Sequence, residues 1–308
     1  MSGLARRWES AAGMLARRGW AFASEIVNDR VALTAVGILA VIVGTAVFAQ
    51  VLAPYDPSKT DILIRLRPPV WEAGGTAEHV LGTDQLGRDV LSRLIYGARV
   101  SLVVAVSVVL AAGMFGTIVG MVAGFYGGRV DDAIMRLVDI QTAFPGILLV
   151  LLILATLGSG ILSVIVVLTM TGWMVFARLA RGQVVALREQ QFLESAVSVG
   201  CDPRRIIFVH IVPNLASPIL TLGALELARV ILVEAVLSFL GVGIQPPSTS
   251  WGLMIAEGQI YITTAWWLVT LPGLAIGATV LTVNLVAGWL RTHADPTQRY
   301  RRGVSVGA

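Results

Sequence analysis

The chain alternates between long apolar stretches and shorter polar segments, and this alternation predicts its architecture. Four apolar stretches cover residues 31–55, 100–128, 213–243 and 268–290. Residues 140–177 carry no charge and are divided at Gly158-Ser159-Gly160, so they predict two further spans, with residues 133–144 leading into the first. A helix needs about 20 apolar residues to cross a bilayer, whereas barrel strands alternate over about ten. We therefore expect an all-α, polytopic membrane protein with six transmembrane helices.

Composition agrees with this class of protein. Hydrophobic residues make up 56% of the chain, charged residues 14%, and the mean hydropathy is +0.79. Soluble domains carry roughly 25% charged residues. The net charge of +4 comes from arginines beside the apolar stretches, which favours membrane topology over nucleic-acid binding. Cys201 is the only cysteine, so no internal disulfide and no metal site is expected.

The distribution of arginine predicts the orientation. Arginines precede the first span and follow the second, fourth and sixth, while the outer loops after the third and fifth contain no Lys or Arg. Positive residues favour the cytoplasmic side, so both termini are expected there. We expect a cytoplasmic interfacial segment at 1–30, the first span at 31–55, an extracytoplasmic loop at 56–99, a five-helix core at 100–291 and a cytoplasmic tail at 292–308.

The most distinctive polar segment is a cytoplasmic loop at residues 190–214, between the fourth and fifth spans. A short helical pattern ends at Gly200, where a left-handed backbone is favourable, and Asp202-Pro203 restarts a helix that continues to Pro213. The small side chains of Ser195 and Ala196 leave one side of the first helix thin. The loop is either a docking bracket for a cytoplasmic partner or a simple elbow between spans.

Several motifs resemble a known family. The spacing Glu194-Ser195-Ala196, Gly200 and Pro213 is similar to the EAA loop of permease subunits of ABC importers. Further segments resemble the dipeptide/oligopeptide/nickel permease family, in its DppC/OppC-type subunit. These are residues 79–89 (HVLGTDQLGRD), 126–128 (YGG), 143–145 (AFP), 234–241 (EAVLSFLG), 245–247 (QPP) and 250–252 (SWG).

The resemblance implies a type I ABC importer (MetI-like) permease fold and a non-catalytic role in uptake of dipeptides or oligopeptides. Nickel-chelate, haem or glutathione uptake is the alternative. The implied partners are a DppB/OppB-type permease, one or two DppD/DppF-type ATPases and an extracytoplasmic binding protein. ATP and Mg would bind the ATPases, because this chain lacks a Gly-x4-Gly-Lys-Ser/Thr loop and is expected to bind no cofactor. The implied ATPase-coupling residues are Glu194, Ser195, Ala196, Gly200, Asp202, Pro203, Arg204 and Pro213.

Ionisable residues in the fifth span form a second set of candidates. Charges in hydrocarbon are costly, so Glu226, Arg229 and Glu234 should face protein or water. They line either the solute path or an interface, or Glu226 and Arg229 form an internal pair across three residues. A proton-coupled secondary transporter with Glu226 and Glu234 as relay groups is the alternative from another functional class, and a membrane scaffold without transport is a third.

Two further patterns predict contacts. Asp84, Arg88 and Asp89 precede the second span and could touch an extracytoplasmic partner, unless they serve locally, with Thr83 or Asp84 capping a short helix. Glycines recur along the second span at spacings of three and four, which predicts close packing against a partner or against the fifth span. They are Gly113, Gly116, Gly120 and Gly124.

Overall fold

The computed structural model describes residues 29–294, and within this part of the chain all regular elements are helices, with no strand. The expected interfacial segment and C-terminal tail lie almost wholly outside the described residues. The helices are α2 (Arg30–Val47), α3 (Ala49–Leu52), η1 (Ile62–Ile64), α4 (Val90–Tyr126), α5 (Gly128–Thr142), α6 (Gly146–Leu157), α7 (Ile161–Arg188), α8 (Gln191–Ser198), α9 (Pro203–Arg205), η2 (Ile206–Ile211), α10 (Val212–Phe239), α11 (Trp251–Gly258), η3 (Gln259–Tyr261) and α12 (Trp267–Ala294). The predicted all-α class is confirmed.

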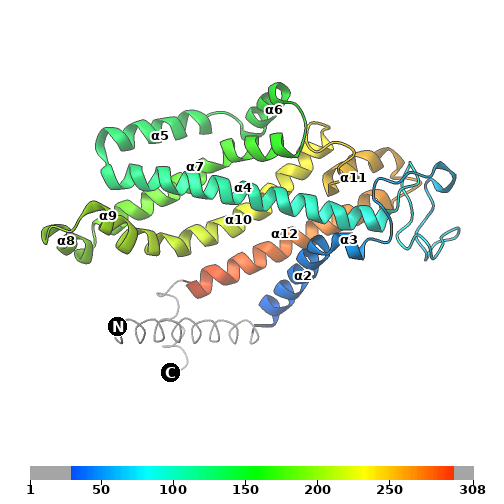
Figure 1. The fold of residues 1–308 in the computed structure, drawn as a ribbon, viewed down its shortest axis with the longest axis horizontal. Coiled ribbons are helices and arrows are strands. Elements are labelled where there is room, and N and C mark those ends of the chain that lie inside the picture. Colours follow the sequence, from blue (N-terminus) through cyan, green and yellow to red (C-terminus); the bar gives the residue numbers. More distant parts are fainter. Residues whose placement is uncertain (1–28, 295–308) are drawn as a thin grey trace, which may run out of the picture.

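The long helices α4, α7, α10 and α12 run along the length of the molecule (Figure 1). The short helices α8 and α9 lie at one end. At the opposite end lie α11 and the long segment between α3 and α4 (Figure 1). The chain therefore presents two distinct polar ends separated by a helical bundle.

Four described helices are long and apolar enough to cross a membrane: α2, α4, α7 and α12. The pair α5 and α6 counts as a fifth if it is one span broken by a bend of 87°. Pro145 stands at this break, where a proline favours the start of a new helix. The predicted fifth span, α10, is not among these helices. Length and hydropathy thus support four to five spans, against the six expected from the sequence.

The glycines of α4 form a seam with α7. A Cβ added at Gly120 would lie 2.1 Å from the carbonyl oxygen of Ala177, and one at Gly116 would lie 2.2 Å from that of Trp173. The two backbones therefore approach so closely that no side chain fits between them. The expectation that this stripe packs against a partner or the fifth span is wrong, because the carbonyls that it meets belong to the fourth.

The helix α4 begins ten residues earlier than the apolar pattern predicted, at Val90 instead of residue 100. Residues 90–99 contain Arg93 and Arg99, so hydropathy alone assigned them to the outer loop. The structure shows Arg93 inside the protein with 2% of its surface exposed. A buried arginine requires a compensating negative charge.

The segment after α10 folds back onto the bundle. Ser250 caps α11, and this helix contacts α10, α12 and α4. The indole N–H of Trp251 donates a hydrogen bond to the carbonyl of Leu94, 2.9 Å away. The segment between α10 and α12 therefore contains a packed helix.

Candidate functional site

The loop between α7 and α10 has the predicted helix–glycine–helix form. Gly200 has φ +79°, and the N–H of Cys201 donates to the carbonyl of Ala196 over 3.0 Å, as in a glycine-terminated helix end. Asp202 then accepts a hydrogen bond from the N–H of Arg204 at 3.1 Å, and Pro203 occupies the first turn of α9. Both the stop and the restart thus have local causes in the sequence.

The restarted helix does not end at Pro213. The short α9 passes into the π-helix η2 and then into α10, which begins at Val212. Pro213 lies in the first turn of α10, where the absence of a backbone N–H costs little hydrogen bonding within the helix. The second arm of the bracket is therefore continuous with α10.

The loop is anchored on one side and open on the other. Leu193 of α8 is 2% exposed and packs in a cluster with Val184, Ile206, Ile211 and Leu215, which belong to α7, η2 and α10. On the other side, Glu194 and Ser195 are exposed and Ala196 is partly buried. Large apolar side chains are exposed nearby, including Val199 and Phe208. A fixed helix beside exposed apolar surface is suited to a protein partner.

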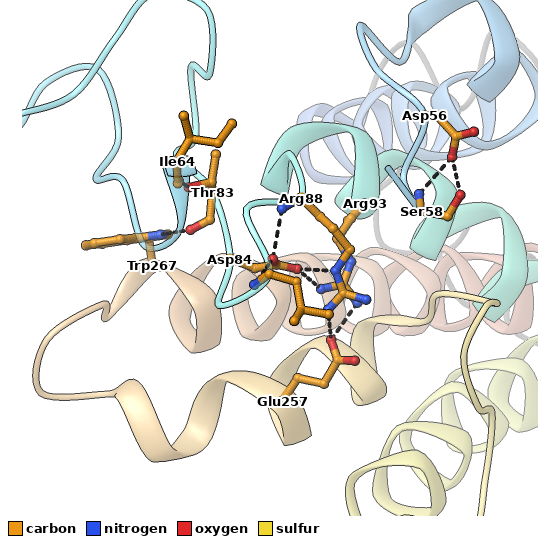
Figure 2. Close-up of polar contacts among 10 residues, drawn as sticks. Asp56, Ser58, Ile64, Thr83, Asp84, Arg88, Arg93, Glu257 and Trp267 are labelled. Carbon is orange, nitrogen blue, oxygen red and sulfur yellow. Dashed lines mark hydrogen bonds and ion pairs between the residues drawn. The ribbon is translucent and has the colours of Figure 1, made fainter. Parts of the chain in front are cut away.

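At the opposite end, four charged side chains form a buried ionic cluster (Figure 2). Arg88 contacts Asp84 at 2.6 Å and Glu257 at 2.7 Å, and Arg93 contacts Glu257 at 2.7 Å and also Asp84. Two cations and two anions compensate one another. Because Glu257 lies on α11, the cluster joins this helix to the start of α4 and the segment before it.

Sequence reasoning missed Arg93 and Glu257. Glu257 is the only charged residue between Glu234 and Arg291. A lone carboxylate in so long an uncharged stretch signals a cationic partner elsewhere in the chain. The sequence did not identify that partner, because Arg93 lies 164 residues away.

The candidate extracytoplasmic contacts are used inside this chain. Asp84 is 1% exposed, Arg88 7% and Asp89 3%. Asp89, and neither Thr83 nor Asp84, caps α4 by accepting a hydrogen bond from the N–H of Ser92 at 2.7 Å. Its other carboxylate oxygen lies 2.9 Å from Nδ1 of His79. Asp84 instead accepts from the N–H groups of Leu86 and Arg88 in the turn before the helix.

The same outer segment contains smaller polar contacts (Figure 2). Asp56 accepts hydrogen bonds from the hydroxyl and the N–H of Ser58, at 2.5 and 2.8 Å, and these bonds lower the pKa of this carboxyl. The carbonyl of Thr83 accepts from the indole of Trp267 at 3.3 Å. The Trp267 contact holds the segment against α12, whereas the Asp56 contacts stabilise a local turn.

The ionisable residues of α10 fall into two environments. Arg229 Nε donates to Glu226 at 2.6 Å, which confirms that the two residues can pair; Glu226 is buried, whereas 48% of the Arg229 side chain is exposed. Glu234 is fully buried and accepts hydrogen bonds from the hydroxyls of Ser101 and Ser238, at 3.0 and 2.8 Å. In this structure Glu234 therefore links α10 to α4 inside the chain.

Comparison with known proteins places the chain in a family. Residues 116–300 match the family described as binding-protein-dependent transport system inner membrane component, and residues 23–69 match the N-terminal TM domain of oligopeptide transport permease C. The chain is 39% identical to the di/tripeptide transport system permease protein DppC of Pseudomonas aeruginosa, over 89% of this chain and 91% of that protein. It is 36% identical to the oligopeptide transport system permease protein OppC of Bacillus subtilis, over 88% and 87%.

A solved structure gives the same fold. The inward-facing MetNI methionine ABC transporter aligns with a TM-score of 0.53 at 16% identity, over 66% of this chain and 96% of the matched chain. The chain belongs to the family of binding-protein-dependent transport system inner membrane components. It is a multi-pass membrane permease of the DppC/OppC type with a MetI-like fold.

The Glu226–Arg229 pair allows a first prediction. In Glu226→Gln, the amide oxygen still accepts from Arg229, and a pair with a half-exposed partner contributes no more than about 1 kcal/mol. We expect transport by the assembled complex to change by less than about fivefold. Initial uptake rates at matched assembly measure this. A selective loss of uptake with normal assembly would assign the pair to the solute path.

Proposed function

We propose that this chain forms, with a homologous permease, the translocation path of an ABC importer for dipeptides or oligopeptides. Separate ATPase subunits that bind ATP and Mg drive it, and an extracytoplasmic binding protein delivers the solute. The relatives named as di/tripeptide and oligopeptide permeases support the substrate class. The observation that carries the coupling role is the anchored loop with the spacing Glu194, Gly200, Pro213.

The loop geometry supports a direct mechanical role. One face of α8 packs on the bundle through Leu193, which leaves Glu194 and Ser195 free for a groove in an ATPase. The arm that contains Asp202, Pro203 and Arg204 continues without a break into α10. A displacement of the loop by nucleotide-driven closure of the ATPases is therefore transmitted to α10.

The proposed orientation follows from the two polar ends. The loop lies in the cytoplasm with both termini, as the arginine distribution favours. The buried ionic cluster and α11, at the opposite end in Figure 1, then face the outside. In this position the surface around α11 is presented to the binding protein.

Glutathione uptake is a second candidate, because the chain is 38% identical to the glutathione transport system permease protein GsiD of Pectobacterium atrosepticum, over 89% of this chain and 90% of that protein. The experiment is ATP-dependent, vanadate-sensitive uptake by proteoliposomes that contain the complete complex. Uptake of dipeptides is expected. Uptake of glutathione without uptake of dipeptides would change the assigned substrate to glutathione. Uptake driven by a proton gradient without ATPases would overturn the proposal.

The variant Gly200→Asp tests the loop in the same assay. No atom lies within 4 Å of the added Cβ, and the left-handed backbone costs about 1 kcal/mol, so the fold should persist. A new charge in a desolvated interface costs 2 kcal/mol or more, so uptake should fall by more than about tenfold while membrane insertion continues. Gly241→Asp is the matched control, since Gly241 has φ +78° and no atom within 4 Å of its Cβ position, just past the other end of α10. Equal uptake by the two variants would contradict the coupling role.

A further inference from the structure

A polar cavity of about 630 Å³ lies against α10, between α7 and α12. Its polar lining residues are Gln183, Asn214, Ser217, Thr221 and Arg291, and no carboxylate is among the residues that line it. This volume is within the range of small-molecule sites. Amides, hydroxyls and one guanidinium give this open cavity a positive polarity, and Asn214, Ser217 and Arg291 are exposed in it.

The lining of α10 is a continuous stripe. Asn214, Ser217 and Thr221 are spaced by three and four residues, so they share one face of the helix. Leu225, which also lines the cavity, and Arg229 follow at two further steps of four. The Arg229 guanidinium reaches towards α7, since it lies 3.7 Å from the Cβ position of Gly172. The polar face therefore runs from Asn214 to Thr221 at the loop end of α10, and Arg229 lies beyond the apolar Leu225.

The cavity has unused hydrogen-bonding capacity. Among the described residues, Arg291 makes no ion pair, and the side chains of Gln183 and Ser217 make no hydrogen bond. Asn214 donates to the carbonyl of His210, and Thr221 donates to that of Ser217, so the side-chain oxygens of both still accept. The cavity thus offers one cation, several donors and several acceptors to a ligand.

We propose that this cavity binds the C-terminal end of the transported peptide, with Arg291 holding the carboxylate. Gln183, Asn214 and Ser217 would bind the last peptide group. A guanidinium matches a carboxylate through two parallel hydrogen bonds, and neutral amides match the main chain without selecting a side chain. The inference rests on the proposed function and adds a site for the solute on the loop-facing half of the path.

A lipid is the less suitable occupant. A more apolar groove, which would suit acyl chains better, lies elsewhere; residues such as Leu39, Val43 and Val103 line it, and Arg99 is its cation. The polar cavity instead has a hydrogen-bonding wall. Pro213 lines it as well, so its shape depends on the coupling loop. A peptide that leaves when the loop moves fits this arrangement.

The first test uses the complete complex in proteoliposomes and measures dipeptide uptake per ATP hydrolysed. The variant Arg291→Gln removes the charge-assisted pair with the peptide carboxylate, so it should lower this ratio by about tenfold. Stimulation of ATP hydrolysis by the binding protein should persist in this variant. Arg291→Lys should recover part of the ratio. Arg178→Gln is the control, because Arg178 is an exposed arginine of α7 paired with Asp139 outside the cavity. An unchanged ratio in Arg291→Gln overturns the site; absence of ATP-driven uptake by the native complex instead overturns the proposed function.

A second test does not depend on assembly of the arginine variant. In the background Cys201→Ser, the variant Thr221→Cys is modified with a charged methanethiosulfonate reagent during turnover. The transported dipeptide should slow this modification several-fold, and Leu110→Cys, in the groove between α4 and α10, should show no such protection. Absence of protection at Thr221 overturns the site. Loss of a co-purifying phospholipid in Arg291→Gln without a change in coupling would also overturn it, in favour of a lipid.

Discussion

Gly120→Val will prevent the chain from accumulating as a folded permease. The added Cβ alone would lie 2.1 Å from the carbonyl of Ala177 and 2.7 Å from its Cα, and these backbone atoms cannot rotate away. The helices α4 and α7 must then separate along their seam, where Cβ atoms at Gly116 and Gly124 would lie 2.2 and 2.8 Å from carbonyl oxygens of α7. Overpacking costs 1–3 kcal/mol in adaptable cores, and we expect the upper end or more here.

The measurement is the yield of monodisperse protein after detergent extraction, together with its thermal unfolding midpoint. Gly182→Val is the matched control, because Gly182 lies in α7 with no atom within 4 Å of its Cβ position. Both variants introduce the same β-branched residue into a helix, so propensity cancels. Equal yields would show that the α4–α7 seam tolerates separation.

Arg93→Met will destabilise the outer end of the protein by about 3–5 kcal/mol, the usual cost of removing one member of a buried ion pair. Asp84 and Glu257 would then share the single cation Arg88. The side chain of Arg93 is 2% exposed, so water cannot replace its charge. Loss of the link between α4 and α11 should appear as rapid proteolysis near Glu257 and a lower unfolding midpoint.

Two further variants make this prediction specific. Arg99→Met removes an exposed arginine one and a half turns later in α4 and should change the midpoint little. Adding Glu257→Leu to Arg93→Met leaves the neutral pair Asp84–Arg88, so the double variant should be more stable than the single one. Additive losses would show that the charges act independently.

Hydropathy predicted the helical class of the fold because exposing unpaired backbone groups to lipid is costly. A long apolar segment therefore has little alternative to a helix. It misplaced the start of α4 for a definite reason. Arg93 is charged in the sequence but neutralised in the structure by Asp84 and Glu257, and hydropathy has no term for a distant partner. The bend at Pro145 was missed because residues 140–157 carry no charge on either side of it.

The helix–glycine–helix form of the loop at residues 190–214 was predicted because its geometry is local. Gly200 and Asp202 act on residues within four positions of themselves, so a motif is enough to describe them. The ionic cluster was only half foreseen, since Asp84 and Arg88 were noted without Arg93 or Glu257. The partner of the glycine stripe was wrong because small residues indicate close approach without naming the helix that approaches.

The glycine seam also determines where this protein can deform. Along this seam α4 and α7 meet through their main chains, which cannot adjust by changing side-chain rotamers. The two helices therefore form a rigid pair. In contrast, α10 borders two cavities, one of about 550 Å³ next to α4 and one of about 630 Å³ between α7 and α12. A helix that borders cavities can shift with less disruption of the helices around it than a helix held by main-chain contact. In this chain, that helix is α10.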